Sequence, residues 1–137
     1  MTRVVVDANI MVGALLGRSL PLFIGLLERD VEVLAPIPML IEAEERIGRD
    51  ERLIEGEAAR RLGELLEVVT PVRVEEFAEH EEAARERLEA HAQSDWPLLA
   101  AALALDADIW TKDRDLFGTG VAVWATRNIR FVEREAL

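Results

Sequence analysis

Carboxylates stand where two short apolar runs of the sequence end. The run Val4 to Val6 stops at Asp7, and Asp113 follows closely after the run Ile109 to Thr111. Such β-branched and apolar runs predict buried strands. Ligands of an open parallel sheet bind at the carboxyl ends of its strands, so we expect both acids at one edge of a sheet.

Two further acids repeat this placement on other predicted elements. Glu42 lies on the helix after the second strand, and Asp95 opens the helix that precedes the fourth strand. Clustered carboxylates raise one another's pKa, and a hard divalent cation such as Mg²⁺ relieves the repulsion because it prefers carboxylate and water oxygens. Carboxylate-held Mg²⁺ or Mn²⁺ can activate a water and neutralise a phosphate, so the pattern favours phosphodiester cleavage.

The spacing of apolar residues predicts helices that alternate with short strands. Ser94 is the expected N-cap of the last long helix, and Pro71 marks the third strand as short or at an edge. We expect helices over 9–16, 36–47, 51–67, 74–92 and 95–105, one more beginning at Leu20, and strands over 4–6, 31–34, 68–72, 108–111 and 121–124. This alternation indicates an α/β fold with a parallel sheet covered on both faces.

The composition is that of one domain with its own core. The 137 residues are 50% apolar, so we expect residues 1–137 to form a single domain. The absence of cysteine excludes disulfides, thiolate metal sites and a cysteine nucleophile, and it fits a cytoplasmic location. No apolar stretch approaches the ~20 residues of a membrane span, so no membrane partner is expected.

The net charge of −11 argues on its own against nonspecific nucleic-acid binding, which rests on basic patches. A bound metal answers this objection because it lets an acidic pocket accept a phosphate. Arg114, Arg127 and Arg130 are the candidates for positive charge at the rim of such a pocket, where a phosphate-bearing substrate would bind.

Four segments together resemble the PIN-domain ribonucleases, the fold of VapC-type toxins in bacterial and archaeal toxin–antitoxin pairs. These segments are VVVDANI at 4–10, LIE at 40–42, SDWPLLAAA at 94–102 and IWTKDRDL at 109–116. Their order and spacing cover essentially the whole chain. The resemblance implies a three-layer α/β/α sandwich around a central, mostly parallel sheet of about five strands.

Carried over position by position, the resemblance makes Asp7, Glu42, Asp95 and Asp113 an acidic catalytic quartet. The metal ligands would be Asp7, Asp95, Asp113 and the accessory acid Asp115, with Asn9 and Thr111 orienting carboxylates or waters. Glu44 and Glu45 lie close to Glu42, and a shift of register would exchange them. Glu42 is preferred because it directly follows the apolar pair 40–41.

Each of these acids taken alone has an ordinary structural explanation, as a helix cap, a turn former or a solvated residue. Their joint occurrence in the matching order is what favours a site. His80 and His91, on a charged helix far from the acids in sequence, are expected at the solvated surface, as are Asp106 and Asp108. The three tryptophans are expected to pack in a core or interface.

The sequence therefore predicts a Mg²⁺- or Mn²⁺-dependent endoribonuclease that cleaves single-stranded RNA. The expected partners are a small antitoxin protein and a second copy of the chain in a homodimer. Two alternatives remain open at this point. One is an RNA-processing PIN nuclease without an antitoxin, and the other is a PIN-fold interaction protein that has lost activity.

Overall fold

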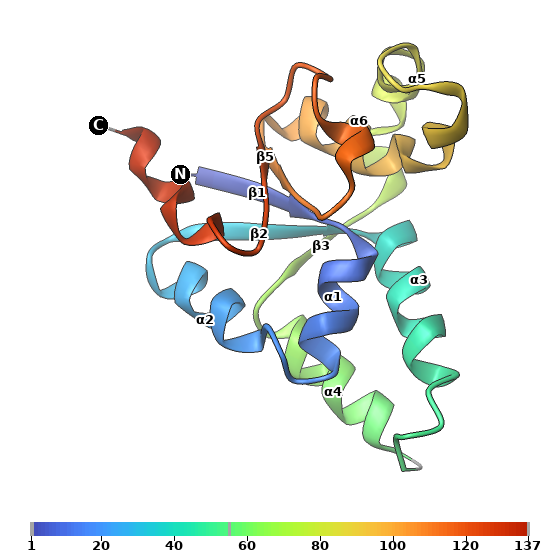
Figure 1. Ribbon diagram of the computed structural model, residues 1–137, viewed down its shortest axis with the longest axis vertical. Coiled ribbons are helices and arrows are strands. Elements are labelled where there is room, and N and C mark those ends of the chain that lie inside the picture. The colour runs from blue at the N-terminus through green and yellow to red at the C-terminus, as the bar shows by residue number, and fades with distance from the viewer. Residues whose placement is uncertain (1, 55, 137) are drawn as a thin grey trace.

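The computed structural model describes residues 2–54 and 56–136, which form a parallel sheet between two layers of helices (Figure 1). Within the described residues the sheet has five strands in the order β3-β2-β1-β4-β5, and each neighbouring pair is parallel. The strands are β1 (Thr2–Val6), β2 (Val31–Pro36), β3 (Thr70–Val72), β4 (Asp108–Trp110) and β5 (Val123–Trp124). The predicted α/β fold is confirmed, and β3 with Pro71 lies at an edge.

The central strand β1 shows why the sheet needs cover on both sides. Val4 and Val6 point into one core, while Val5 points into the other, and all three are fully buried. On the side of Val4 lie α1 (Ala8–Leu15), α2 (Leu20–Glu28), α3 (Ile37–Gly48) and α4 (Glu57–Leu66). On the side of Val5 lie α5 (Glu81–Glu86) and α6 (Trp96–Leu105), which Figure 1 shows above the sheet.

Aromatic and small side chains fill these two cores. Trp110 of β4 is fully buried, and its ring lies 4.6 Å from that of Phe23 on α2. In the second core Phe77 packs against Trp96 with ring centroids 5.9 Å apart. The expectation that the tryptophans pack in a core is confirmed for Trp110 and Trp96.

The prediction of one long charged helix over 74–92 is wrong. The segment instead forms short 3-10 turns (Val74–Glu76, Ala78–His80 and Ala90–Asp95) around the six-residue α5. Phe77 leaves helical geometry with φ −137° and buries its ring, and Gln93 donates hydrogen bonds to the carbonyls of Arg85 and Leu88 that end α5. The tertiary contacts of these two side chains outweigh the helix propensity of the surrounding Glu, Ala and Arg residues.

The helix expected over 51–67 begins later, at Glu57. The Asp50 carboxylate accepts a hydrogen bond from the backbone N–H of Arg52, which forms a turn, and Gly56 has φ +83°, a left-handed conformation that precedes the helix. Residue 55 lies outside the described part of the chain. The expected N-cap is also shifted by one residue, because α6 begins at Trp96 and Asp95, not Ser94, stands at the cap.

No single helix in the described residues is long and apolar enough to cross a membrane. The helices α1 and α2 reach that length only when taken together, and they meet at a bend of 105°.

Candidate active site

An acidic pocket lies at the carboxyl edge of the sheet, where β1 and β4 end. It has a volume of about 310 Å³. All four residues of the expected quartet line it, together with Asp115. The complete lining is Asp7, Ala8, Asn9, Met39, Glu42, Arg46, His91, Ser94, Asp95, Asp113 and Asp115.

Asp7 is the most constrained of these acids. It follows β1 and caps α1, where its Oδ1 accepts a hydrogen bond from the backbone N–H of Ile10 at 3.0 Å. Its Oδ2 accepts a hydrogen bond from the hydroxyl of Thr111. Burial raises the pKa of Asp7, the hydrogen bonds from Thr111, Ile10 and Asn9 oppose that rise, and the charge of Asp113 adds to it.

The segment after β4 brings two more acids to the same edge. Val6 pairs with Trp110 in the parallel register, so the residues that follow the two strands lie next to each other. The backbone N–H of Asp113 donates to the hydroxyl of Thr111 at 3.0 Å, and the Asp113 carboxylate accepts from the backbone N–H of Asp115 at 2.9 Å. Thr111, only 1% exposed, therefore links Asp7 to Asp113.

Asp95 stands opposite this segment, at the N-terminus of α6. Its side chain makes no capping hydrogen bond and lines the pocket together with that of Asp113. The pKa of Asp95 is raised from 3.8 to about 7, first by burial, then by the hydrogen bond with Asp113 and the charges of Asp113, Asp7 and Asp115. Near neutral pH this pair of carboxyls therefore holds a proton, which a bound cation would displace.

Glu42 enters the pocket from α3, and its neighbours do not. Glu44 lines a separate groove between α1, α3 and α4, and Glu45 is exposed outside the pocket lining. Glu42 forms an ion pair with Arg46 at 3.4 Å, and Arg46 also donates a hydrogen bond to the side chain of Asn9. This contact fixes the side chain of Asn9 at the pocket rim.

His91 is exposed, as expected, but it also lines the acidic pocket, a position that was not predicted from the sequence. Its Nε2 lies 3.0 Å from Oδ1 of Asp115, and this contact raises the pKa of the His91 imidazole. The sequence signal for this pocket position was that His91 lies only four residues before Asp95. The expected long helix obscured it, because that helix would have carried His91 on a solvated face. Arg46 was missed as well, although its spacing from Glu42 is that of an i,i+4 helix pair.

The three arginines expected at the rim do not line this pocket. Arg114 lies between two lining residues in the sequence but is exposed outside the lining, and Arg127 is also exposed. The guanidinium of Arg130 lies 4.8 Å from the ring of Phe131. Of the two surface acids expected, Asp106 is exposed, while Asp108 is half-buried and accepts a hydrogen bond from the indole of Trp124 at 2.9 Å.

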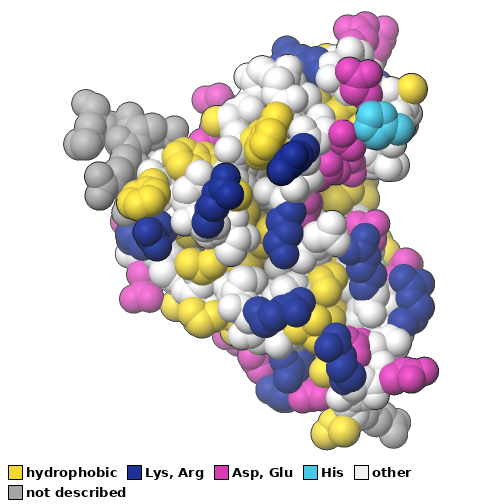
Figure 2. Space-filling model, viewed as in Figure 1, with side chains coloured by type: hydrophobic (Ala, Val, Ile, Leu, Met, Phe, Trp, Pro, Cys, Tyr) yellow, Lys and Arg dark blue, Asp and Glu magenta, His cyan; other side chains and the backbone are white. Residues whose placement is uncertain are grey.

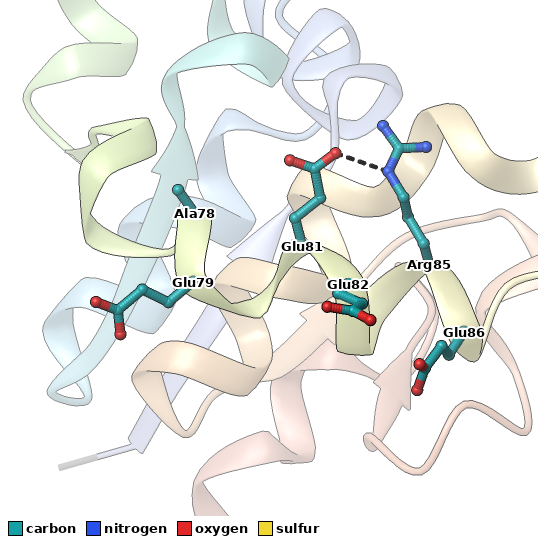
Figure 3. A pocket seen from close by; sticks show the side chains of 6 residues that line it. All are labelled: Ala78, Glu79, Glu81, Glu82, Arg85 and Glu86. Atoms are coloured by element: carbon teal, nitrogen blue, oxygen red, sulfur yellow. Dashed lines mark hydrogen bonds and ion pairs between the residues drawn. The ribbon is translucent and has the colours of Figure 1, made fainter.

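A larger hollow of about 620 Å³ lies around α5, but its chemistry differs (Figure 3). Its polar lining is four glutamates and Arg85, and the carboxylate of Glu81 is taken up by an ion pair with Arg85 at 2.7 Å. No residue there follows a strand of the sheet. The acidic pocket at the carboxyl edge is therefore the better candidate for catalysis.

Comparison of the whole sequence with known protein families identifies one domain. The PIN domain matches residues 5–134, a range that includes every residue lining the acidic pocket. The chain belongs to the PIN-domain family. A comparison with functionally curated proteins finds no match.

Solved structures share this PIN fold at low sequence identity. VapBC2 from Rickettsia felis, bound to a DNA fragment from its promoter, matches with a TM-score of 0.73 at 14% identity, over 90% of this chain and 98% of that one. PAE2754 from Pyrobaculum aerophilum matches with a TM-score of 0.64 at 19% identity, over 98% and 90%. FitAcB from Neisseria gonorrhoeae matches with a TM-score of 0.56 at 19% identity, over 92% and 99%.

PIN-domain nucleases generally use divalent metal ions, and the donors of this pocket suit such an ion chemically. They are hard carboxylate oxygens, and the raised pKa of Asp95, caused by burial and by the neighbouring acids, marks a place where negative charge lacks a counter-ion. Among the described residues, no three acidic or imidazole side chains are yet grouped closely enough to enclose a metal. Binding would thus require these side chains to turn toward the ion.

Proposed function

We propose that this PIN domain is a metal-dependent endoribonuclease that hydrolyses phosphodiester bonds of single-stranded RNA. The observation that carries the proposal is the convergence of Asp7, Asp95 and Asp113 in one pocket at the carboxyl edge of the sheet. The raised pKa of Asp95 also supports the proposal, because a cation bound beside this carboxyl would stabilise its charged form. Membership of a family of nucleases supports the reaction class.

Asp7, Asp95, Asp113 and Asp115 would hold Mg²⁺ or Mn²⁺ in this proposal. A bound ion would supply Lewis-acid activation of a water and neutralise charge on the phosphate. The contribution of the chain is mainly positional. Thr111 and the N-terminus of α1 orient the Asp7 carboxylate. The raised pKa of Asp95 lets this carboxyl hold a proton near neutral pH when no cation is bound.

Glu42 and Asn9 complete the pocket in distinct roles. Glu42 is proposed as the fourth acid and Asn9 as a polar group that orients substrate or water. Arg46 touches both residues and offsets part of the pocket's negative charge. A group of this kind lets a phosphate approach carboxylates without meeting an uncompensated negative field.

We further propose that the protein is the toxin of a VapBC-type pair. The fold similarity to VapBC2 and FitAcB supports this assignment. The partner would be a small antitoxin that places a cationic side chain in the acidic pocket, where it would replace the charge of the metal and block the substrate. The active form is proposed to be a cytoplasmic homodimer.

A cleavage assay with purified protein tests the nuclease. A labelled single-stranded RNA should be cut when Mg²⁺ or Mn²⁺ is added to protein freed of metal, and EDTA should stop the reaction. Persistent cleavage in EDTA would overturn the metal dependence. If no RNA tested is cut, although a divalent ion binds in the pocket, a PIN-fold interaction protein becomes the better account.

Expression in a bacterial host separates the toxin from other nucleases. Wild-type protein should arrest growth, and Asp7→Asn should not. Co-expression of the small open reading frame adjacent to the gene should restore growth. Metal-dependent cleavage in vitro without any effect on growth would instead favour an RNA-processing nuclease that has no antitoxin.

A further inference from the structure

A second cavity, of about 180 Å³, adjoins the acidic pocket on the side of α2. Its polar lining includes Asn9, Arg18, Ser19 and Lys112. Asn9 also lines the acidic pocket, so the two cavities share a wall. Lys112 is the residue immediately before Asp113, which places the second cavity beside the acids that would act on a phosphate.

The charge of this cavity is opposite to that of the acidic pocket. Arg18 and Lys112 are both exposed, and neither side chain has a hydrogen-bond or ion-pair partner among the described residues. Several other arginines are paired with acids, such as Arg52 with Asp50 and Arg60 with Glu57 and Glu64. Figure 2 shows Lys and Arg side chains gathered on the face that carries α1, although the chain as a whole is acidic.

A hydroxyl group in the same cavity also lacks a partner. The Oγ of Ser19 is buried without a hydrogen bond to any described residue, and Ser19 precedes α2 without capping it. Buried polar groups are normally hydrogen-bonded, so an unsatisfied hydroxyl in a cavity wall indicates an absent acceptor.

Gly13 keeps the cavity open on its other side. It lies inside α1, where glycine is less favourable than alanine. Its φ is not positive, so the backbone does not require glycine. A Cβ at this position would stand 3.3 Å from Ser19 Oγ, a tight contact on the cavity wall.

We propose that this cavity binds a backbone phosphate of the RNA next to the phosphate that is cleaved. Arg18 and Lys112 supply the charge, and the Ser19 hydroxyl donates a hydrogen bond. A strand that crosses Asn9 would then place neighbouring phosphates in the cationic cavity and in the acidic pocket. This inference rests on the proposed function, since it names a subsite for the same substrate.

Binding in the presence of EDTA tests the proposal apart from cleavage. The probe is a fluorescein-labelled single-stranded RNA of about twelve nucleotides, followed by anisotropy over a range of salt concentrations. Arg18→Ala and Lys112→Ala should each raise Kd about tenfold and reduce the slope of log K against log salt by about 0.7, as expected for one lost phosphate contact. Lys112→Arg should retain binding, since it retains the charge.

Two further variants separate charge and structure from direct contact. Arg49→Ala removes the same charge at the end of α3, outside both cavity linings, and should change Kd less than about twofold. Ser19→Ala should weaken RNA binding without lowering the melting temperature, because its hydroxyl makes no bond within the protein. A purely structural serine would instead lower the melting temperature when replaced.

Each remaining outcome decides the proposal. Equal effects of Arg18→Ala, Lys112→Ala and Arg49→Ala on Kd would overturn it, even if the wild type cuts RNA with Mn²⁺. Binding of inorganic phosphate or of polyglutamate that depends on the cavity, while RNA binding does not, would assign the cavity to a free anion or an acidic protein and also overturn it. Failure of the wild type to cut RNA, with cavity-dependent RNA binding intact, would contradict the nuclease function and leave the subsite in place.

Discussion

The hydroxyl of Thr111 donates a hydrogen bond to the carboxylate of Asp7, across the join between β4 and β1. The same oxygen accepts the backbone N–H of Asp113 at 3.0 Å. One fully buried side chain thus fixes two acids that lie more than a hundred residues apart in the sequence. The arrangement of the pocket depends on this contact.

Thr111→Val should destabilise the fold and weaken metal binding. The isosteric change leaves one Asp7 oxygen and the Asp113 N–H without their partner, and a buried unsatisfied group costs about 1–3 kcal/mol. The loss should appear in urea denaturation of the metal-free protein and as a higher Kd for Mn²⁺. Thr111→Ser keeps the hydroxyl and serves as the control. Equal metal affinity in the valine and serine variants would show that this hydrogen bond does not organise the pocket.

The Asp95 carboxyl should stabilise the metal-free protein at acidic pH, and this contribution should be lost as the pH rises toward neutrality. A carboxyl whose pKa is higher in the folded state binds more protons when folded, so it stabilises at low pH and that stabilisation disappears as the pH rises. For Asp95 the contribution is complete below about pH 3.8 and is lost as the pH rises through its raised pKa of about 7. Asp7, whose pKa is also raised, acts in the same direction.

Asp95→Asn should therefore flatten the dependence of unfolding free energy on pH in EDTA. Asp50→Asn is the matched control, because Arg52 lowers the pKa of Asp50 to about 2 and so gives the opposite sign. Denaturation curves at several pH values from about 2 to 8 would measure both, because the Asp50 contribution changes at and below about pH 3.8 and the Asp95 contribution above it. If the pH profile of Asp95→Asn coincides with that of the wild type, the inference that Asp95 and Asp113 hold a proton near neutral pH is contradicted.

His91→Gln should change metal binding more than stability. The imidazole is exposed, so its contact with Asp115 adds little to folding. Asp115 raises the pKa of His91, so the charged imidazole competes with a cation for that carboxylate at mildly acidic pH. The variant should bind Mn²⁺ more tightly than the wild type wherever the imidazole is charged, a pH range that reaches above its ordinary pKa of about 6.5, and the difference should vanish at higher pH. A constant difference at all pH values would rule out this competition.

The strands and the acids at their ends could be predicted because their signals are local. Val4 to Val6 is too short and too β-branched for a helix, and a parallel sheet places Asp7 and Asp113 at one edge whatever else the chain does. Glu42 also follows from local spacing, since the turn of α3 that aims it at the pocket aims Glu44 into a different groove.

The segment from Val74 to Asp95 could not be predicted in the same way. Its helix is cut short by the burial of Phe77 against Trp96 and by the hydrogen bonds of Gln93 to the end of α5, both of which depend on the folded structure. The position of His91 depends on that interruption, and so does its contact with Asp115. The cationic cavity also joins distant residues, Arg18 after α1 and Lys112 after β4, and no local pattern relates them.

The cleavage rate of acid-to-amide variants tests the account most directly. Single-turnover cleavage of one labelled RNA in Mn²⁺ should fall at least about a hundredfold in Asp7→Asn, Asp95→Asn and Asp113→Asn, because each removes a proposed ligand. Asp106→Asn makes the same chemical change at an exposed helix end and should cut RNA at the wild-type rate. Circular dichroism should show that all four remain folded. If Asp113→Asn cleaves as fast as Asp106→Asn, the acidic pocket is not the active site.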